Sequence, residues 1–141
     1  MTDVSNSVIS RVKAYENAWN THNSDDIVAF FTEDADMVMG NSPIAVGRDA
    51  IRDWWEKYFG QIHSTRIGVF TIDSMRIISP EVVLLNIEST TSGFGPGGDI
   101  LPERKARGTW ILTKSTGDWL ISALRGLPAE GDSRVSHGTD H

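Results

Sequence analysis

Among the side chains of this 141-residue chain that are suited to proton transfer, His63 and Glu88 are the candidates for a catalytic role. The imidazole of His63 has a reference pKa near neutrality and follows a predicted helix. Glu88 shares one face of a predicted strand with Leu84 and Asn86, so it can stand at the polar end of a pocket. Both residues also have a simpler interpretation. A loop histidine is usually solvated, and Glu88 can form a surface ion pair with Arg107 on the next strand.

Aromatic side chains can line a pocket for a flat or polycyclic ligand. The candidates in this chain are Trp19, Trp54, Trp55, Phe59 and Trp110. Aromatic residues at helical spacing also build ordinary cores, and the adjacent Trp54 and Trp55 cannot both face the same way. We therefore expect a partly aromatic cavity, with at least one of these two indoles facing the core or an interface.

The charge of the chain restricts its partners. The formal net charge is −6 at pH 7, whereas proteins that bind nucleic acid concentrate lysine and arginine on one face. We therefore expect no nucleic-acid partner. Arg125, at the end of the last predicted strand, is a candidate for holding an anionic group of a ligand. The alternative is a salt bridge of Arg125 across a dimer interface.

Several kinds of reactive centre are excluded by the residue types. The chain has no cysteine, which excludes disulfides, thiolate nucleophiles, iron–sulfur clusters and cysteine-bound zinc. Its four histidines show no ligand spacing on a helix or strand: His22, His63, His137 and His141. We expect neither a metal nor a cofactor.

Gly93–Gly98, within a glycine-rich segment, formally matches the G-x-G-x-x-G pattern of dinucleotide-binding proteins. That pattern needs a strand before it and a helix after it, to hold the pyrophosphate. Here it lies between two predicted strands and contains a proline. We interpret residues 92–104 as a flexible flap over a pocket or an arm that reaches a partner subunit.

Length and composition indicate one domain with one core over residues 1–127, followed by a disordered polar tail over residues 128–141. The start, MTDVSNSVISRVK, lacks the basic and then apolar pattern of a secretory signal. No apolar stretch approaches the roughly 20 residues that a membrane span needs. The expectation is a soluble cytoplasmic protein with no membrane partner.

Helical periodicity predicts three helices in the first 60 residues. The first covers residues 4–22, with one apolar face made by Val8, Val12, Tyr15 and Trp19. Ser24 is a candidate N-cap for a short second helix that ends near Phe31. The third helix covers Arg48–Phe59, between Gly47 and Gly60.

The remaining segments are typical of strands. Ala35–Met39 is a brief strand that turns back into Ile44–Val46. An antiparallel meander then follows, with strands at Thr65–Ile78, Val82–Ser92, Ala106–Lys114 and Trp119–Arg125. This order predicts an α+β fold, with three N-terminal helices on one side of a curved antiparallel sheet that encloses a conical hollow.

Some of these strands are apolar on both faces. In Trp119–Arg125, one face carries Trp119 and Ile121, and the other carries Leu120 and Leu124. Such strands need cover on both sides, and the helices can cover only one. We therefore expect the other face to pack against a second copy of the chain in a homodimer.

At this point the residues show a resemblance to a known family. The segments that carry it are Tyr15…Trp19-Asn20, Asp25–Phe31, Thr32–Ala35, Gly47–Ile51, Gly108–Trp110 and Gly117–Ile121. They resemble the nuclear transport factor 2-like superfamily, in its SnoaL-like and SgcJ/EcaC-like bacterial branch, over roughly residues 8–126. The resemblance implies a cone-shaped, cystatin-like roll whose pocket lies inside the cone under the third helix.

The resemblance also implies roles for particular residues. Tyr15 falls on the position of the oxyanion-hole tyrosine of the related steroid isomerases, and Trp55 on that of another pocket aromatic. Met39 occupies the position of their catalytic carboxylate. Tyr15 would then donate a hydrogen bond to a ligand carbonyl or a developing oxyanion. The alternative is a core tyrosine with its hydroxyl at the edge of the helix packing.

Two functional hypotheses follow. In the first, a small organic molecule undergoes cofactor-free cyclisation, isomerisation or dehydration in a semi-apolar pocket. Tyr15 would polarise an oxygen, and His63 or Glu88 would move a proton. The ligand-binding residues would be Trp19, Met39, Trp55, Phe59, Trp110 and Arg125. In the second, the chain is a non-catalytic ligand-binding protein or a dimeric assembly module. A cavity above about 300 Å³ would favour a ligand, and a filled cone would favour assembly.

Overall fold

The computed structural model describes residues 2–61, 65–95, 97–115 and 117–128. Within them the chain forms α1 (Thr2–Trp19), α2 (Ser24–Val28), β1 (Phe31–Met39), β2 (Ala45–Val46), α3 (Arg48–Phe59), β3 (Ile67–Ser79), β4 (Val82–Ser92), β5 (Arg104–Thr113) and β6 (Leu120–Pro128). None of the helices in this part of the chain is long and apolar enough to cross a membrane.

The strands form one curved sheet in the order β2-β1-β6-β5-β4-β3. Strands β3 to β6 make the predicted antiparallel meander, and β2 pairs with β1 as the predicted hairpin. One pair differs from the expectation: β1 lies parallel to β6, with Met37 opposite Leu124. The sheet is therefore mixed. The sequence contains no local signal for this pair because its two strands are far apart in the chain and no short turn joins them.

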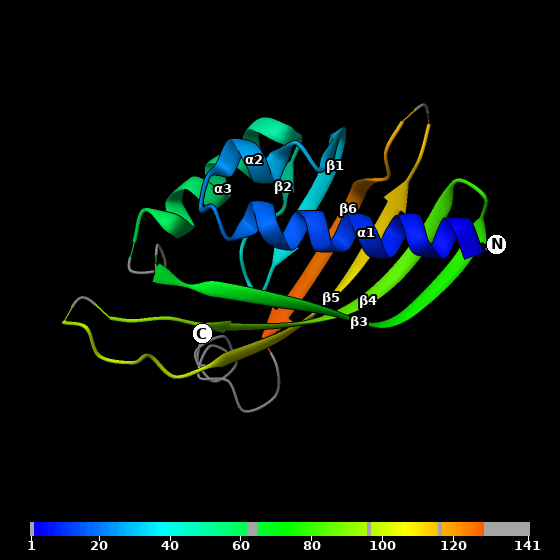
Figure 1. Ribbon diagram of the computed structural model, residues 1–141. Coiled ribbons are helices and arrows are strands. Elements are labelled where there is room, and N and C mark those ends of the chain that lie inside the picture. The colour runs from blue at the N-terminus through cyan, green and yellow to red at the C-terminus, as the bar shows by residue number, and fades with distance from the viewer. Residues whose placement is uncertain (1, 62–64, 96, 116, 129–141) are drawn as a thin grey trace.

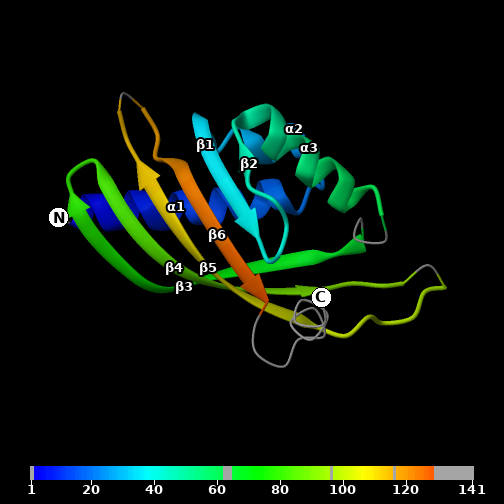
Figure 2. The same ribbon diagram turned by 180° about the vertical axis from the view of Figure 1, so that it is seen from behind.

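All three helices lie on the concave side of the sheet, and the convex side carries no helix of the described residues (Figures 1 and 2). The predicted α+β architecture, with helices on one side of a curved sheet, is confirmed. The predicted apolar face of α1 is also confirmed, since Val8, Val12, Tyr15 and Trp19 are all buried. These side chains fill the space between the helix layer and the sheet.

The ends of the first two helices differ slightly from the prediction. α1 stops at Trp19, because His22 adopts a left-handed backbone conformation with φ of 60°, which a helix cannot contain. The N-cap of α2 is Asn23 and not Ser24. The side-chain oxygen Oδ1 of Asn23 accepts a hydrogen bond from the backbone N–H of Asp25 at 2.9 Å. The turn between α1 and α2 is therefore held by its own side chains.

The glycine-rich segment forms a short projecting arm between β4 and β5 (Figures 1 and 2). Phe94 and Ile100 face each other in an antiparallel bridge, and the Gly95 N–H donates to the Asp99 carbonyl at 2.7 Å. No helix follows it, so the arm lacks the helix N-terminus that a dinucleotide site needs. Of the predicted polar tail, residues 129–141 lie outside the described part of the chain, and Pro128 ends β6.

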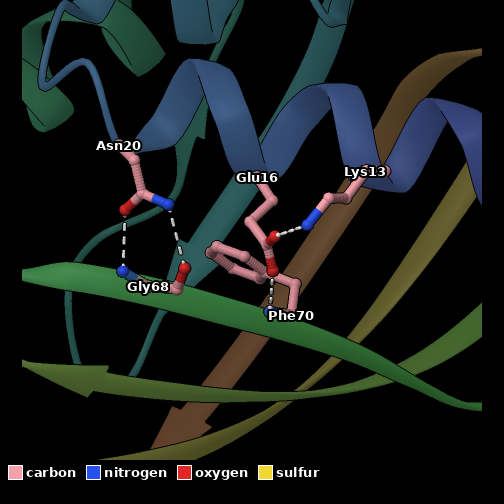
Figure 3. A network of polar contacts seen from close by, with 5 residues as sticks. All are labelled: Lys13, Glu16, Asn20, Gly68 and Phe70. Carbon is pink, nitrogen blue, oxygen red and sulfur yellow. Dashed lines mark hydrogen bonds and ion pairs between the residues drawn. The ribbon is translucent and has the colours of Figure 1, made fainter.

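Polar side chains of α1 and of Asn20, which directly follows it, bind the backbone of β3, which is an edge strand of the sheet (Figure 3). The Asn20 amide pairs with both backbone groups of Gly68: Oδ1 accepts from the N–H at 2.7 Å, and Nδ2 donates to the carbonyl at 3.0 Å. The Glu16 carboxylate accepts from the Phe70 N–H at 2.8 Å and from Lys13 Nζ at 2.6 Å. These side chains pair with backbone groups that a neighbouring strand would otherwise bind. They therefore protect the edge strand from pairing with another chain.

The same contacts set the ionisation of Glu16. Burial on its own would raise the pKa of the Glu16 carboxyl, but the hydrogen bonds from Lys13 and from the Phe70 N–H outweigh it, so the pKa is lowered. The carboxylate therefore contributes stability at neutral pH, and this contribution disappears as the pH falls through the lowered pKa.

We expect Asn20→Asp to lower the free energy of unfolding by about 1–3 kcal/mol. The new carboxylate can still accept from the Gly68 N–H, but it cannot donate to the Gly68 carbonyl and repels its oxygen. Urea denaturation at neutral pH measures the change. The matched control is Asn17→Asp, an exposed position on the same helix. Equal losses in the two variants would show that the Asn20–Gly68 pair does not stabilise the fold.

Candidate functional site

A small cavity lies between the helices and the concave face of the sheet. Its walls include Tyr15 of α1, Trp55 of α3, Phe70 of β3, Met39 of β1 and Trp110 of β5. Its volume is about 40 Å³, which is room for one or a few water molecules. Pockets for drug-sized ligands have volumes of about 300 Å³ and more. The interior of the cone is therefore mostly filled by side chains, which is the outcome that favours assembly, and a ligand of more than a few atoms has to displace part of the wall.

Tyr15 is held in place by aromatic contacts on several sides. Its ring centre lies 4.8 Å from that of Trp110, 5.5 Å from Phe70 and 5.7 Å from Phe30, all edge to face. Only 2% of the residue is exposed, and no described residue forms a hydrogen bond with its hydroxyl. Burial raises the pKa of the Tyr15 phenol well above its usual range. The group therefore stays protonated and can act as a hydrogen-bond donor.

The floor of the cavity consists of small residues on the central strands. Gly108 of β5 lies opposite Gly126 of β6, and Ala106 lies opposite Ser89 of β4. All four border the cavity. A Cβ atom at Gly126 would lie only 2.8 Å from Met39 Sδ, so the glycine is what allows the methionine to lie against the sheet. The hollow exists because large side chains are missing along this row.

The aromatic residues of α3 close the cavity from above. Trp55 borders it, and the indole ring centre of Trp19 lies 6.0 Å from that of Trp55. Phe59 stacks on Trp55 at 5.8 Å. The indole N–H of Trp55 is buried without a hydrogen-bond partner among the described residues. As expected for adjacent positions, Trp55 is buried while Trp54 is only partly so.

The structure brings together some of the predicted site residues and separates others. Tyr15, Met39, Trp55 and Trp110 border the cavity, and Trp19 and Phe59 pack around Trp55. His63 lies outside the described residues.

Two predicted site residues lie on the convex face, away from the cavity. Glu88 alternates with the buried Ile87 of β4, which places it on that face, opposite Arg107. Their charged groups do not form an ion pair. Arg125 is also on the convex face, where its Nη1 bonds Asp36 Oδ1 at 2.7 Å. Neither side chain is placed to contact a molecule in the cavity.

Sequence reasoning missed the floor of the cavity and one charged residue next to it. The signal is the two-residue period of β5. Counting back from the buried Trp110, the same face carries Gly108, Ala106 and Arg104. This alternation predicts a gap in the packing at Gly108 and Ala106, where the side chains are small. It also predicts a cation, Arg104, on the same face at the start of the strand.

The chemical capacity of the site follows from its lining. The described residues that border the cavity include no carboxylate and no imidazole, and Tyr15 supplies a protonated phenol. Across the described residues there is also no group of three or more histidine, aspartate or glutamate side chains that could hold a metal ion. The described lining can donate a hydrogen bond to an oxygen atom in apolar surroundings, and it offers no side chain that accepts a proton.

Comparison with known families matches residues 12–121 to the SnoaL-like domain. The chain belongs to the SnoaL-like domain family. This confirms the resemblance at the level of the superfamily, while the finer SgcJ/EcaC-like assignment stays a prediction. No curated protein matches the sequence.

Similar solved structures confirm the cystatin-like fold. A domain of unknown function with a cystatin-like fold from Nostoc punctiforme has a TM-score of 0.78 at 18% identity, covering 99% of this chain and 86% of that chain. An uncharacterised protein with the same fold from Caulobacter vibrioides has a TM-score of 0.77 at 19% identity, covering 97% of each chain. A ketosteroid isomerase-like protein from Erwinia carotovora atroseptica has a TM-score of 0.72 at 18% identity, covering 86% of this chain and 92% of that chain.

The burial of Tyr15 predicts a loss of stability at alkaline pH. Above about pH 10 the unfolded chain ionises this phenol while the folded chain does not, so the free energy of unfolding falls as the pH rises. The contribution of Tyr15 approaches about 1.4 kcal/mol per pH unit. Chemical denaturation between neutral pH and pH values above 10 should show a steeper decline in the parent than in Tyr15→Phe. Tyr58→Phe, which changes the other tyrosine, should keep the steep decline. Equal slopes in the parent and Tyr15→Phe would contradict the buried, neutral phenol.

Proposed function

We propose that this SnoaL-like protein binds a small, mostly apolar molecule in the cavity, with the Tyr15 hydroxyl donating a hydrogen bond to an oxygen of that molecule. One observation carries the proposal. Tyr15 is 2% exposed and borders an apolar cavity, and no described residue forms a hydrogen bond with its hydroxyl. Polar groups in apolar surroundings normally have a hydrogen-bond partner. A ligand oxygen supplies the missing partner.

The volume of the cavity limits the ligand. A space of about 40 Å³ accepts only a few atoms beyond a water molecule. A larger ligand has to move part of the wall, and Met39 is the side chain best suited to move. Its unbranched thioether adapts easily to a new shape, and it lies over Gly126, where no side chain blocks it. A single aromatic ring with one acceptor oxygen is the size class that we favour.

Binding is favoured over acid–base catalysis because the described lining supplies no proton acceptor. Cyclisation, isomerisation and dehydration each need a base within hydrogen-bond reach of the substrate. Met39 occupies the position where the resemblance to steroid isomerases implies a carboxylate, and a thioether cannot accept the proton. Glu88 is on the convex face. A role for Tyr15 as hydrogen-bond donor needs no such base.

A ketone and its hydrocarbon counterpart test the proposal. We expect acetophenone to bind and to shift the indole N–H signals of Trp55 and Trp110 in a nitrogen–proton NMR spectrum. Tyr15→Phe should lower the affinity for acetophenone about fivefold, since one neutral hydrogen bond is worth about 1 kcal/mol. Ethylbenzene, which lacks the oxygen, should bind the parent and the variant equally. If millimolar acetophenone leaves both indole signals unshifted, the proposal fails.

The convex face of the sheet supports the second part of the proposal, that the chain is a homodimer. This face carries no helix (Figure 2), yet it holds half-exposed aliphatic side chains. Ile67 is 49% exposed, Val69 54% and Leu127 64%, and Leu84 and Ile111, which pair further along the sheet, are partly buried. Apolar groups spread over an open sheet are typical of an interface. A two-fold axis would let the same face cover itself in a second copy.

We expect sedimentation at micromolar concentration to give the mass of two chains. Val69→Lys should shift the species toward the single-chain mass, because a lysine at the interface would bury an unpaired charge. The control is Ile9→Lys, which has a similar exposure of 52% but lies on α1, in the helix layer. A single-chain mass for the parent, or equal effects of the two variants, would contradict a dimer formed through the convex face.

A further inference from the structure

Arg104 lies on the concave face of β5, two residues before Ala106, which borders the cavity. The burial of β5 alternates, with Lys105 and Arg107 exposed and Ala106 partly buried, so Arg104 shares the face of Ala106. Arg104 pairs with Thr91 of β4, one step along the sheet from the pair of Ala106 and Ser89, which borders the cavity. Two residues along a strand span about 7 Å. An arginine side chain has a comparable reach, so the guanidinium can approach a molecule in the cavity.

Arg104 differs from the other free cations of the described chain. No carboxylate of the described residues lies within ion-pair distance of it, and none of these residues forms a hydrogen bond with its side chain. Lys57, Arg76, Lys105 and Arg107 also lack ion pairs, but all of them are exposed to solvent. Arg104 is partly buried. A cation that is partly removed from water without a partner is unfavourable, so its position needs an explanation.

The neighbouring charged groups do not supply that partner. Arg66, beside Arg104 at the same end of the sheet, is buried and donates Nη1 to the Pro102 carbonyl at 3.1 Å. The carboxylate of Glu16 on α1 is bound by Lys13 and by the Phe70 N–H. The concave face at this end therefore has a guanidinium with no partner among the described residues, two residues along β5 from the cavity lining at Ala106.

We propose that the ligand of this cavity is an amphipathic anion, with a carboxylate bound by Arg104 and an apolar part in the cavity. The inference rests on the proposed binding function and adds the charge of the ligand to it. A guanidinium presents paired N–H donors that match the two oxygens of a carboxylate. The ligand then carries a neutral acceptor oxygen near Tyr15, an apolar middle over Ala106 and Gly108, and an anionic end at the mouth.

Arg107 is the competing cation, since it also borders the cavity. Its position on β5 places its side chain on the convex face, opposite Glu88, and it is exposed. A carboxylate at Arg107 would remain in water, where an ion pair is worth little. The geometry therefore favours Arg104, and Arg107 provides a control with the same charge and side chain.

Two probes of nearly equal shape test the inference, 4-acetylbenzoate and its neutral counterpart 4-acetylbenzamide. Both carry a ketone for Tyr15, and only the first carries a carboxylate. We expect the parent protein to bind 4-acetylbenzoate at least about tenfold more tightly, measured by titration of the tryptophan indole signals. Arg104→Gln should abolish this preference, so that the two probes bind the variant within about twofold of each other. Arg107→Gln should keep the preference. Added salt should reduce it in the parent, because the guanidinium is only partly buried.

The outcomes separate this inference from the proposed function. If 4-acetylbenzamide binds and the benzoate binds no better, the anionic ligand is refuted while the binding function stands. If Arg104→Gln leaves the preference intact, the assignment to Arg104 is refuted, and loss of the preference in Arg107→Gln would assign it to Arg107. If neither probe binds and acetophenone also fails, the binding function and the inference fall together.

Discussion

The hydrogen bonds between the end of α1 and the edge of β3 are the constraint on which the rest of the structure depends. Asn20 pairs with both backbone groups of Gly68, and Glu16 binds the next outward-facing N–H, that of Phe70. An edge strand presents unpaired groups at fixed spacing, so these bonds fix the height and the rotation of the helix. Gly68 is required at the contact, because a Cβ atom there would lie 2.9 Å from the Trp19 ring. With the helix fixed in this way, Tyr15 is held over the central strands.

The cavity results from two sequence features that meet only in the folded chain. Large aromatic rings come from the helices and from β3, and a row of small residues comes from β4, β5 and β6. Had Gly108 and Gly126 carried side chains, the floor would be filled and the core would be continuous. Interiors are normally packed to the density of organic crystals, so a gap beside a buried phenol with no partner departs from what stability alone would produce. Such departures are characteristic of functional sites.

The charged residues on the two faces of the sheet differ in their surroundings. On the convex face, Arg125 is neutralised by Asp36, while Glu88 is partly buried and Arg107 is exposed. On the concave face, the cation Arg104 has no counter-ion among the described residues. The net charge of −6 conceals this local excess of positive charge. Whether an anion binds at a site depends on the local electrostatic field and on the geometry of the nearby groups. The net charge of the whole chain does not decide it.

Periodicity and end signals in the sequence were sufficient for the helices, the meander and the buried face of α1, because these depend on contacts within a few residues. The family also followed from local segments such as Gly47–Ile51. The tertiary structure alone decided the parallel pair of β1 and β6, since those strands are distant in the chain and no turn between them records their register. It also decided that Arg125 faces outward and Arg104 inward. A two-residue period tells which side chains share a face, but only the packed helices determine which of the two faces is the inside.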